Sequence, residues 1–186
     1  MDRRKIIFSG AAAAIFVVAV LIMHFAGSRS RASTPGEKTA KNESLIQSQE
    51  VHLYFGDPGS SFLSAENRRL IYSSDPAESG ENILKMLIQG PGPGLMRTIP
   101  PETRVTALYI TDDATAYVDL SKEVSDNHPG GVITELLTIY SIVNSLVLNI
   151  PEIKKVKILI AGREAITLAG HVSLRPYFKA DMLLIR

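Results

Sequence analysis

The sequence predicts an α+β fold in which two helices pack on a mainly antiparallel sheet of about five strands, in the order β-β-α-β-β-α-β. Five short stretches alternate apolar and polar residues with the period of a half-buried strand. Two longer stretches repeat apolar residues at spacings of three and four, as amphipathic helices do. Asp, Gly and Pro separate these stretches, so we expect one compact domain with appendages.

The composition excludes several classes of protein. The chain has 186 residues, of which 45% are hydrophobic and 21% charged, as in an ordinary folded domain. A formal net charge of +1 gives no general basis for binding nucleic acid. The chain has no cysteine, which excludes disulfides, thiolate metal sites, cysteine nucleophiles and the acylated cysteine of a lipoprotein.

The amino terminus has the pattern of a single membrane anchor. Residues 1–5 are basic, and residues 6–26 are apolar except for Ser9 and His24. Such a helix is roughly 30 Å long, the thickness of a bilayer core, and the basic start favours the cytoplasmic side. We therefore expect a single-pass protein of the cytoplasmic membrane with its carboxyl-terminal domain on the periplasmic side. The alternative is a signal peptide cleaved after Ala32, which also exports the chain.

The exported part divides into three segments. Residues 27–50 are polar and form a predicted flexible linker. Residues 51–178 hold the periodic stretches and form the predicted domain, and residues 179–186 form a short tail. The chain after residue 31 contains 15 Lys and Arg and 18 Asp and Glu, so the exported part is mildly acidic. We therefore expect the anchor at 6–26, not the domain surface, to hold the protein at the membrane.

The first half of the domain is predicted to form two strands and a helix. Residues 51–55 alternate, with Val51, Leu53 and Phe55 on one face. Residues 62–72 resume extended character and form a predicted edge strand. Asp75 and Pro76 are typical of a helix start, and the helix ends at Gly90-Pro91.

The second half is predicted to form a hairpin, a long helix and a further strand. Residues 104–110 and 116–120 alternate around the turn Asp112-Asp113 and should pair antiparallel. Residues 132–150 form the strongest predicted helix; its polar stripe comprises Thr134, Thr138, Ser141, Ser145 and Asn149, and its core face comprises Leu136, Leu137, Tyr140, Val143, Leu146 and Val147. Residues 156–160 form the fifth predicted strand, and residues 172–174 are a candidate for a short sixth. We expect a charge at Leu136 or Val143 to unfold the domain.

Several of these features together resemble the GerMN domain family. They are Leu87-Ile88-Gln89-Gly90-Pro91 at a helix end, Ile99-Pro100 before a strand, Ala116-Tyr117-Val118-Asp119-Leu120-Ser121 in the hairpin, and Gly130-Gly131 before the long helix. The resemblance covers roughly residues 50–177. Each piece is weak alone, but their order and spacing around two amphipathic helices are specific.

The resemblance implies an extracytoplasmic module without assigned catalytic residues. Members of the family are anchored in or exported across bacterial membranes, often as lipoproteins, and the fold is similar to ring-building modules of a sporulation channel complex. This sequence departs from the spore-former pattern because it has one such domain and no lipid-attachment cysteine. What the resemblance implies is a membrane-tethered interaction module, and a sporulation role does not carry over with it.

Catalytic, cofactor and metal sites find little support in the sequence. The four histidines show no metal-ligand spacing. Asp119, Ser121 and His128 lie within ten residues but lack the elbow motif of serine hydrolases. We therefore predict no enzyme, no cofactor and no metal.

Two loops are the candidate partner-binding residues, because both should be exposed and stiff. They are Gly90, Pro91, Gly92, Pro93 and Gly94, and His128, Pro129, Gly130 and Gly131. The first loop lacks the free N–H groups and the Lys-Ser/Thr pair of a phosphate cradle. The leading hypothesis is a scaffold or assembly module that binds a bacterial envelope protein or itself. The alternative is a module for peptidoglycan or another envelope ligand, bound through exposed Tyr54, Tyr72 and Tyr117.

Overall fold

The computed structural model of the chain describes residues 48–71 and 73–186. Its elements are β1 (Ser48–Gly56), β2 (Leu63–Ile71), α3 (Pro76–Gln89), β3 (Val105–Ile110), β4 (Thr115–Leu120), α4 (Glu123–Asp126), α5 (Val132–Val147), β5 (Lys155–Ile160) and a 3-10 turn at Met182–Leu184. The predicted order of strands and long helices is confirmed, and α4 adds one turn of helix. The predicted anchor, residues 6–26, and most of the predicted linker lie outside the described residues. Within the described ranges, no helix has both the length and the apolarity to cross a bilayer.

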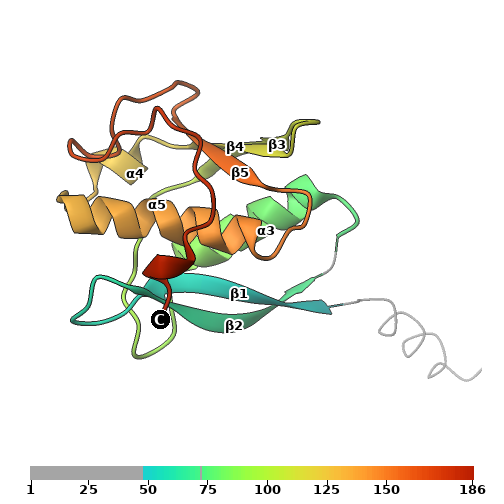
Figure 1. Cartoon of the computed structure of the whole chain (residues 1–186), viewed down its shortest axis with the longest axis horizontal. Helices are drawn as coiled ribbons and strands as arrows, with labels where there is room; N and C mark the ends of the chain where they lie inside the picture. Colours follow the sequence, from blue (N-terminus) through green and yellow to red (C-terminus); the bar gives the residue numbers. More distant parts are fainter. Residues whose placement is uncertain (1–47, 72) are drawn as a thin grey trace, which may run out of the picture. The chain divides into compact units, whose positions relative to one another are not determined.

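The strands form two sheets, so the prediction of a single sheet is wrong. β1 pairs with β2 in one sheet, and the other sheet has the order β3-β4-β5. Figure 1 shows α3 and α5 between the two sheets, and both helices contact strands of both sheets. The helices therefore bury apolar side chains on two sides, which explains why Ile139, Ile142, Val143 and Leu146 of α5 are all fully buried.

The polar stripe of α5 closes the outer edge of β1. The N–H of Tyr54 donates to Ser145 Oγ (3.0 Å), and the Ser141 hydroxyl donates to the carbonyl of Tyr54 (2.5 Å). Asn149 binds both main-chain groups of His52, at 2.9 and 2.7 Å. Four helical residues rise about 6 Å and two strand residues about 6.6 Å, so the two spacings match. Side chains of α5 thus stand where a further strand would pair.

A second correction concerns the pairing of β5. β3 and β4 form the predicted antiparallel hairpin, but β4 and β5 are parallel, from Thr115 opposite Lys155 to Leu120 opposite Ile160. Parallel neighbours need a long crossover, which α5 provides. The candidate sixth strand is not formed; Thr167 and Ser173 make one isolated bridge.

The last residues pack on the domain instead of trailing from it. Asn144 of α5 exchanges two hydrogen bonds with the main chain of Asp181 (2.9 and 3.1 Å). Ile185 packs against the cluster of Tyr54, Leu63 and Leu137. This segment covers Tyr54, which sequence alternation had placed on an exposed face.

Candidate functional site

A cavity of about 330 Å³ opens at the end of the domain where β1 finishes and α5 begins. Its lining comes from the connector residues 96–101, from residues 127–129, and from Gly56, Thr134 and Leu137. Arg97 is the only Lys, Arg, Asp or Glu residue in this lining. The cavity brings His128 and Pro129 of the second predicted loop together with the later part of the connector that follows α3.

The second loop is held in place by its own histidine. His128 Nδ1 accepts from the N–H of Gly130 (3.0 Å), and Nε2 lies 2.9 Å from the Thr138 hydroxyl. Because Nδ1 accepts, we assign the proton to Nε2. Burial lowers the pKa of His128, which keeps the ring neutral. Gly131 follows with a φ of +97°, which L side chains rarely adopt, so this position requires glycine before α5.

The first predicted loop lies elsewhere, against β2. Gly92 donates its N–H to Glu66 (2.7 Å), and Arg68 donates to the carbonyl of Gly90 (2.6 Å). A Cβ on Gly90 would meet the guanidinium of Arg97, which would have to move, and the φ of +94° at Gly90 is one that L side chains rarely adopt. Only Pro93 and Gly94 are exposed. Hydrogen bonds hold the loop, and most of it is not exposed as expected; residues 90–94 do not line the cavity, whereas residues 96–101 do.

Sequence reasoning missed a buried carboxylate that fixes the same end of α5. Glu135 is fully buried and accepts from the N–H of Val172 (2.7 Å) and from the ring and main chain of His171 (2.7 and 3.2 Å). Burial raises the pKa of Glu135, but these hydrogen bonds outweigh it and hold the pKa below its usual value. A lone acid within the apolar start of the predicted helix was the signal that could have found it.

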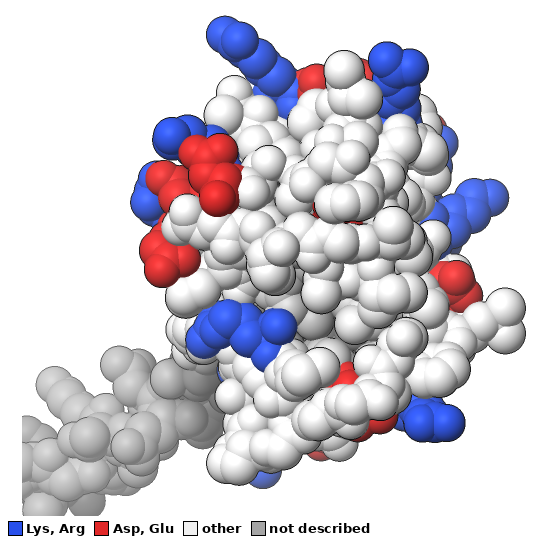
Figure 2. Space-filling model, turned by 90° about the vertical axis from the view of Figure 1, so that its left-hand side faces the viewer, with Lys and Arg blue, Asp and Glu red and all other residues white. Residues whose placement is uncertain are grey.

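The end of the domain around this cavity is poor in charge. Figure 2 views the left-hand side of Figure 1, where α5 begins, and most of that face carries neither acidic nor basic side chains. Val132 and Ile133 open α5 and are 52% and 48% exposed. Exposed first turns usually hold Ser, Asp or Glu. Two exposed branched aliphatics there fit a surface that is covered by a partner.

Each of the three residues that serine hydrolysis would need has a structural hydrogen-bond partner. Asp119 accepts from the N–H of Gly162 (2.8 Å), and Ser121 accepts from the N–H of Arg104 (2.9 Å). His128 is bound to Thr138 and Gly130.

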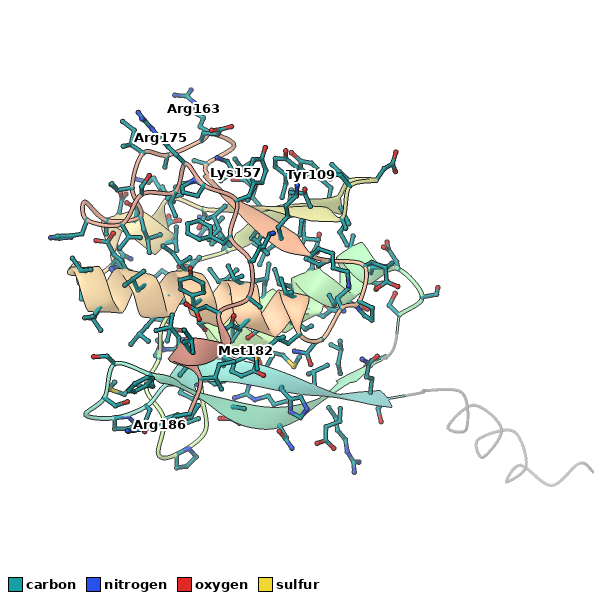
Figure 3. All side chains as sticks on the ribbon, viewed as in Figure 1. Tyr109, Lys157, Arg163, Arg175, Met182 and Arg186 are labelled. Carbon is teal, nitrogen blue, oxygen red and sulfur yellow. The ribbon has the colours of Figure 1, made fainter. Side chains whose placement is uncertain are left out.

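Two of the three predicted tyrosines, Tyr54 and Tyr117, lie among the described residues. Tyr54 is only 7% exposed, so its predicted role in ligand binding is wrong, and Tyr72 lies outside the described residues. Tyr117 instead stacks with Tyr109, with ring centroids 5.0 Å apart. Figure 3 shows Tyr109 on the outer side of the β3-β4-β5 sheet, together with Lys157.

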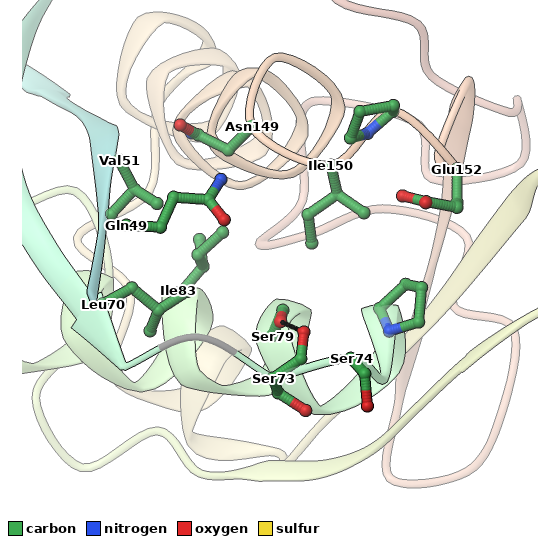
Figure 4. Close-up of a pocket in the computed structure, with 12 residues that line it drawn as sticks. Gln49, Val51, Leu70, Ser73, Ser74, Ser79, Ile83, Asn149, Ile150 and Glu152 are labelled. Carbon is green, nitrogen blue, oxygen red and sulfur yellow. Dashed lines mark hydrogen bonds between the residues drawn. The ribbon is translucent and has the colours of Figure 1, made fainter. Parts of the chain in front are cut away.

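A second cavity, of about 220 Å³, lies between the start of α3 and the residues that follow α5 (Figure 4). Its polar side chains are those of Gln49, Ser73, Ser74, Ser79, Asn149 and Glu152. Asn149 is already bound to β1, and Ser73 donates to Glu78 (2.6 Å). This cavity offers no cation and no acid–base pair.

Comparisons with known proteins bear on this arrangement. The family described as "Germane: Sporulation and spore germination" matches residues 52–166. The crystal structure of a "Putative Lipoprotein from Clostridium perfringens" is similar, with 25% identity, a TM-score of 0.52, and coverage of 73% of this chain and 89% of that one. No curated protein matches the chain.

Two structures of the sporulation protein GerM from Bacillus subtilis share the fold. The tandem GerMN domains match with 24% identity and a TM-score of 0.59, over 72% of this chain and 46% of that one. The first GerMN domain alone matches with 22% identity and a TM-score of 0.58, over 73% of this chain and 98% of that one. The described domain therefore corresponds to about half of the tandem protein.

Proposed function

The chain belongs to the Germane family, and from that premise we propose that it is a non-enzymatic docking module displayed outside the cytoplasmic membrane. It binds a protein of the bacterial envelope or a second copy of itself. Residues 6–26 hold it at the membrane. The similarity to a lipoprotein supports a membrane-held, extracytoplasmic domain.

The observation that carries the proposal is the charge-poor end face, which we define as Val132, Ile133 and the residues lining the 330 Å³ cavity. Its loops are fixed by the hydrogen bonds of His128 and Glu135, so little conformational entropy is lost on docking. An apolar side chain of a partner would fill the cavity, and Val132 and Ile133 would pack beside it. The partner surface that fits this face is uncharged.

The direction of β1 supports the same assignment. The chain enters the domain at Ser48, and Gly56 at the other end of β1 lines the cavity. Nine strand residues span about 27–30 Å. The end face therefore lies at the opposite end of β1 from Ser48, where the predicted linker joins the domain.

Site-specific photo-crosslinking in membranes tests this function. A photoreactive residue at Ile133 should give a discrete band, either one heterologous product or a homo-oligomer ladder. The matched control is Leu148, an exposed aliphatic residue immediately after the same helix. Only uncrosslinked monomer from position 133, or equal products from both positions, would reject the end face as the docking site.

A further inference from the structure

The outer face of the β3-β4-β5 sheet carries a row of aromatic and basic side chains that the docking function does not use. The register places Tyr109 of β3 opposite Tyr117 of β4, and Tyr117 opposite Lys157 of β5. Tyr177 completes the row, because its hydroxyl lies 3.2 Å from that of Tyr117. We define Tyr109, Tyr117 and Tyr177 as the tyrosine strip.

The ring geometry of the strip leaves specific surfaces open. Tyr109 and Tyr117 stack almost parallel, at 6°, and Tyr177 meets Tyr117 edge-on at 6.3 Å. β3 is an edge strand of its sheet, so no strand of residues 48–71 or 73–186 lies beyond Tyr109. Tyr109 and Tyr177 are 48% and 51% exposed. The strip therefore has an open aromatic face at Tyr109 and a pair of phenol hydroxyl groups at Tyr117 and Tyr177.

Basic side chains surround the Tyr177 end of the strip. Lys155 and Lys157 lie 5.2 and 5.4 Å from the centre of the Tyr177 ring. Phe178 is buried and bridges to Val156, so the alternate residues Arg175, Tyr177 and Lys179 emerge on the other side of the segment. Figure 3 shows Arg175 on the same outer side as Lys157 and Tyr109.

The local charge is positive although the exported chain is mildly acidic. Lys155 pairs with Asp113 (3.0 Å) and Lys157 with Glu164 (3.1 Å). Arg175 and Lys179 are exposed, and neither takes part in an ion pair between described residues. Two cationic groups thus remain available for an anionic ligand.

We propose that the tyrosine strip binds a polymer of N-acetylated amino sugars that carries carboxylates. The C–H face of a sugar ring packs on the open face of Tyr109, and the sugar hydroxyls and amides bond to the phenol groups of Tyr117 and Tyr177. Arg175 and Lys179 bind the carboxylates. The strip has hydroxyl tips and few exposed aliphatic groups, which fits a glycan better than an apolar protein surface. This site shares with the proposed docking function only the extracytoplasmic location.

Direct binding to defined glycans tests the strip. The probes are purified peptidoglycan sacculi, a soluble N-acetylglucosamine–N-acetylmuramic acid tetrasaccharide, and the uncharged N-acetylglucosamine tetramer. The chain has six tyrosines and no tryptophan, so tyrosine emission of the full chain in detergent reports on the strip. We expect saturable binding that weakens with salt and is tighter for the carboxylated tetrasaccharide.

Variants decide whether the strip is responsible. Tyr109→Ala with Tyr177→Ala should weaken binding by about tenfold or more, since each aromatic contact contributes on the order of 1 kcal/mol. Tyr109→Phe keeps the stacked ring and should bind almost normally, which guards against misfolding of the alanine variants. Leu183→Ala, at an exposed position outside the strip, is the control.

Three results would overturn the proposal. The first is absence of glycan binding by the unmodified protein. The second is unchanged binding by a folded double alanine variant. The third is equal binding of polyglutamate, which carries carboxylates but no sugar. Each of these leaves the photo-crosslinking result at Ile133 unaffected, so failure of the glycan site and failure of protein docking are distinguishable.

Discussion

Replacing Ser145 by alanine tests whether α5 closes the edge of β1. Ser145 is fully buried, and its Oγ is the acceptor for the N–H of Tyr54. Alanine leaves that N–H buried without a partner, because the neighbouring Ser141 is directed at the carbonyl of the same residue. The change removes one hydroxyl and introduces no bulk.

The expected loss follows from the buried donor. An unsatisfied buried N–H costs about 1–3 kcal/mol. Alanine is a better helix former than serine by about 0.5 kcal/mol, which offsets part of the loss. We expect a net destabilisation of about 1–2 kcal/mol, or roughly 3–6 °C in Tm for a domain of this size.

Urea unfolding followed by circular dichroism measures the free energy of unfolding, and hydrogen exchange reports on the Tyr54 amide. The matched control is Ser79→Ala in α3, where the hydroxyl lies 3.4 Å from its acceptor and is half-buried. We expect Ser79→Ala to change stability little and Ser145→Ala to speed exchange at Tyr54. A Ser145→Ala domain as stable as the unmodified one, with Tyr54 still protected, would refute the reasoning.

Three further predictions concern the helix and the tyrosine strip. Glu135→Ala should destabilise the domain by about 2–4 kcal/mol, because it leaves buried main-chain donors unpaired; thermal unfolding measures this. Folding lowers the pKa of Glu135, so the stabilisation by its carboxylate is complete above the carboxyl pKa of the unfolded chain, about 4.3. This stabilisation is lost as the pH falls through the pKa of the folded state. In a pH series, the free energy of unfolding of the unmodified domain should therefore approach that of Glu135→Ala below that range. The hydrogen bond between Tyr117 and Tyr177, followed by burial, raises the pKa of Tyr117 to about 12, so Tyr177→Phe should move one phenol toward 10 in an ultraviolet titration. An unchanged titration contradicts the pair. Val143→Lys should prevent folding, whereas Leu136→Lys should fold with reduced stability, because Val143 is fully buried and Leu136 half-buried; soluble expression and circular dichroism distinguish them.

The sequence predicted the elements better than their assembly. Period-two and period-3.6 patterns located five strands and two long helices, because those patterns reflect local geometry. The polar stripe of α5 looks the same in sequence whether it faces water or a strand edge, so its contact with β1 could not be read from the pattern. The parallel pairing of β5 was open to prediction, since a long helix between two strands is the usual crossover connection.

The candidate site was predicted only in part. The dipeptide His128-Pro129 lines the cavity, but residues 90–94 do not, because Glu66 and Arg68 of β2 hold them elsewhere. The residues missed in the connector, 96–101, had no periodicity to mark them, and Arg97 is their one charged side chain. Tyr109 and Tyr177 acquire a shared surface only through strand register and the return of the carboxyl-terminal segment, and both are long-range features.

The bonds between α5 and β1 have a consequence for how the chain reaches its native state. The partners of His52 and Tyr54 lie 97 and 91 residues further along the sequence. During synthesis, the hairpin of β1 and β2 therefore emerges with the edge of β1 unpaired, and that edge can pair with strands of neighbouring chains. The edge of β1 cannot be closed until α5 has been synthesised. A chain truncated before Val132 should therefore be bound by chaperones or degraded by proteases and should not form a stable fragment.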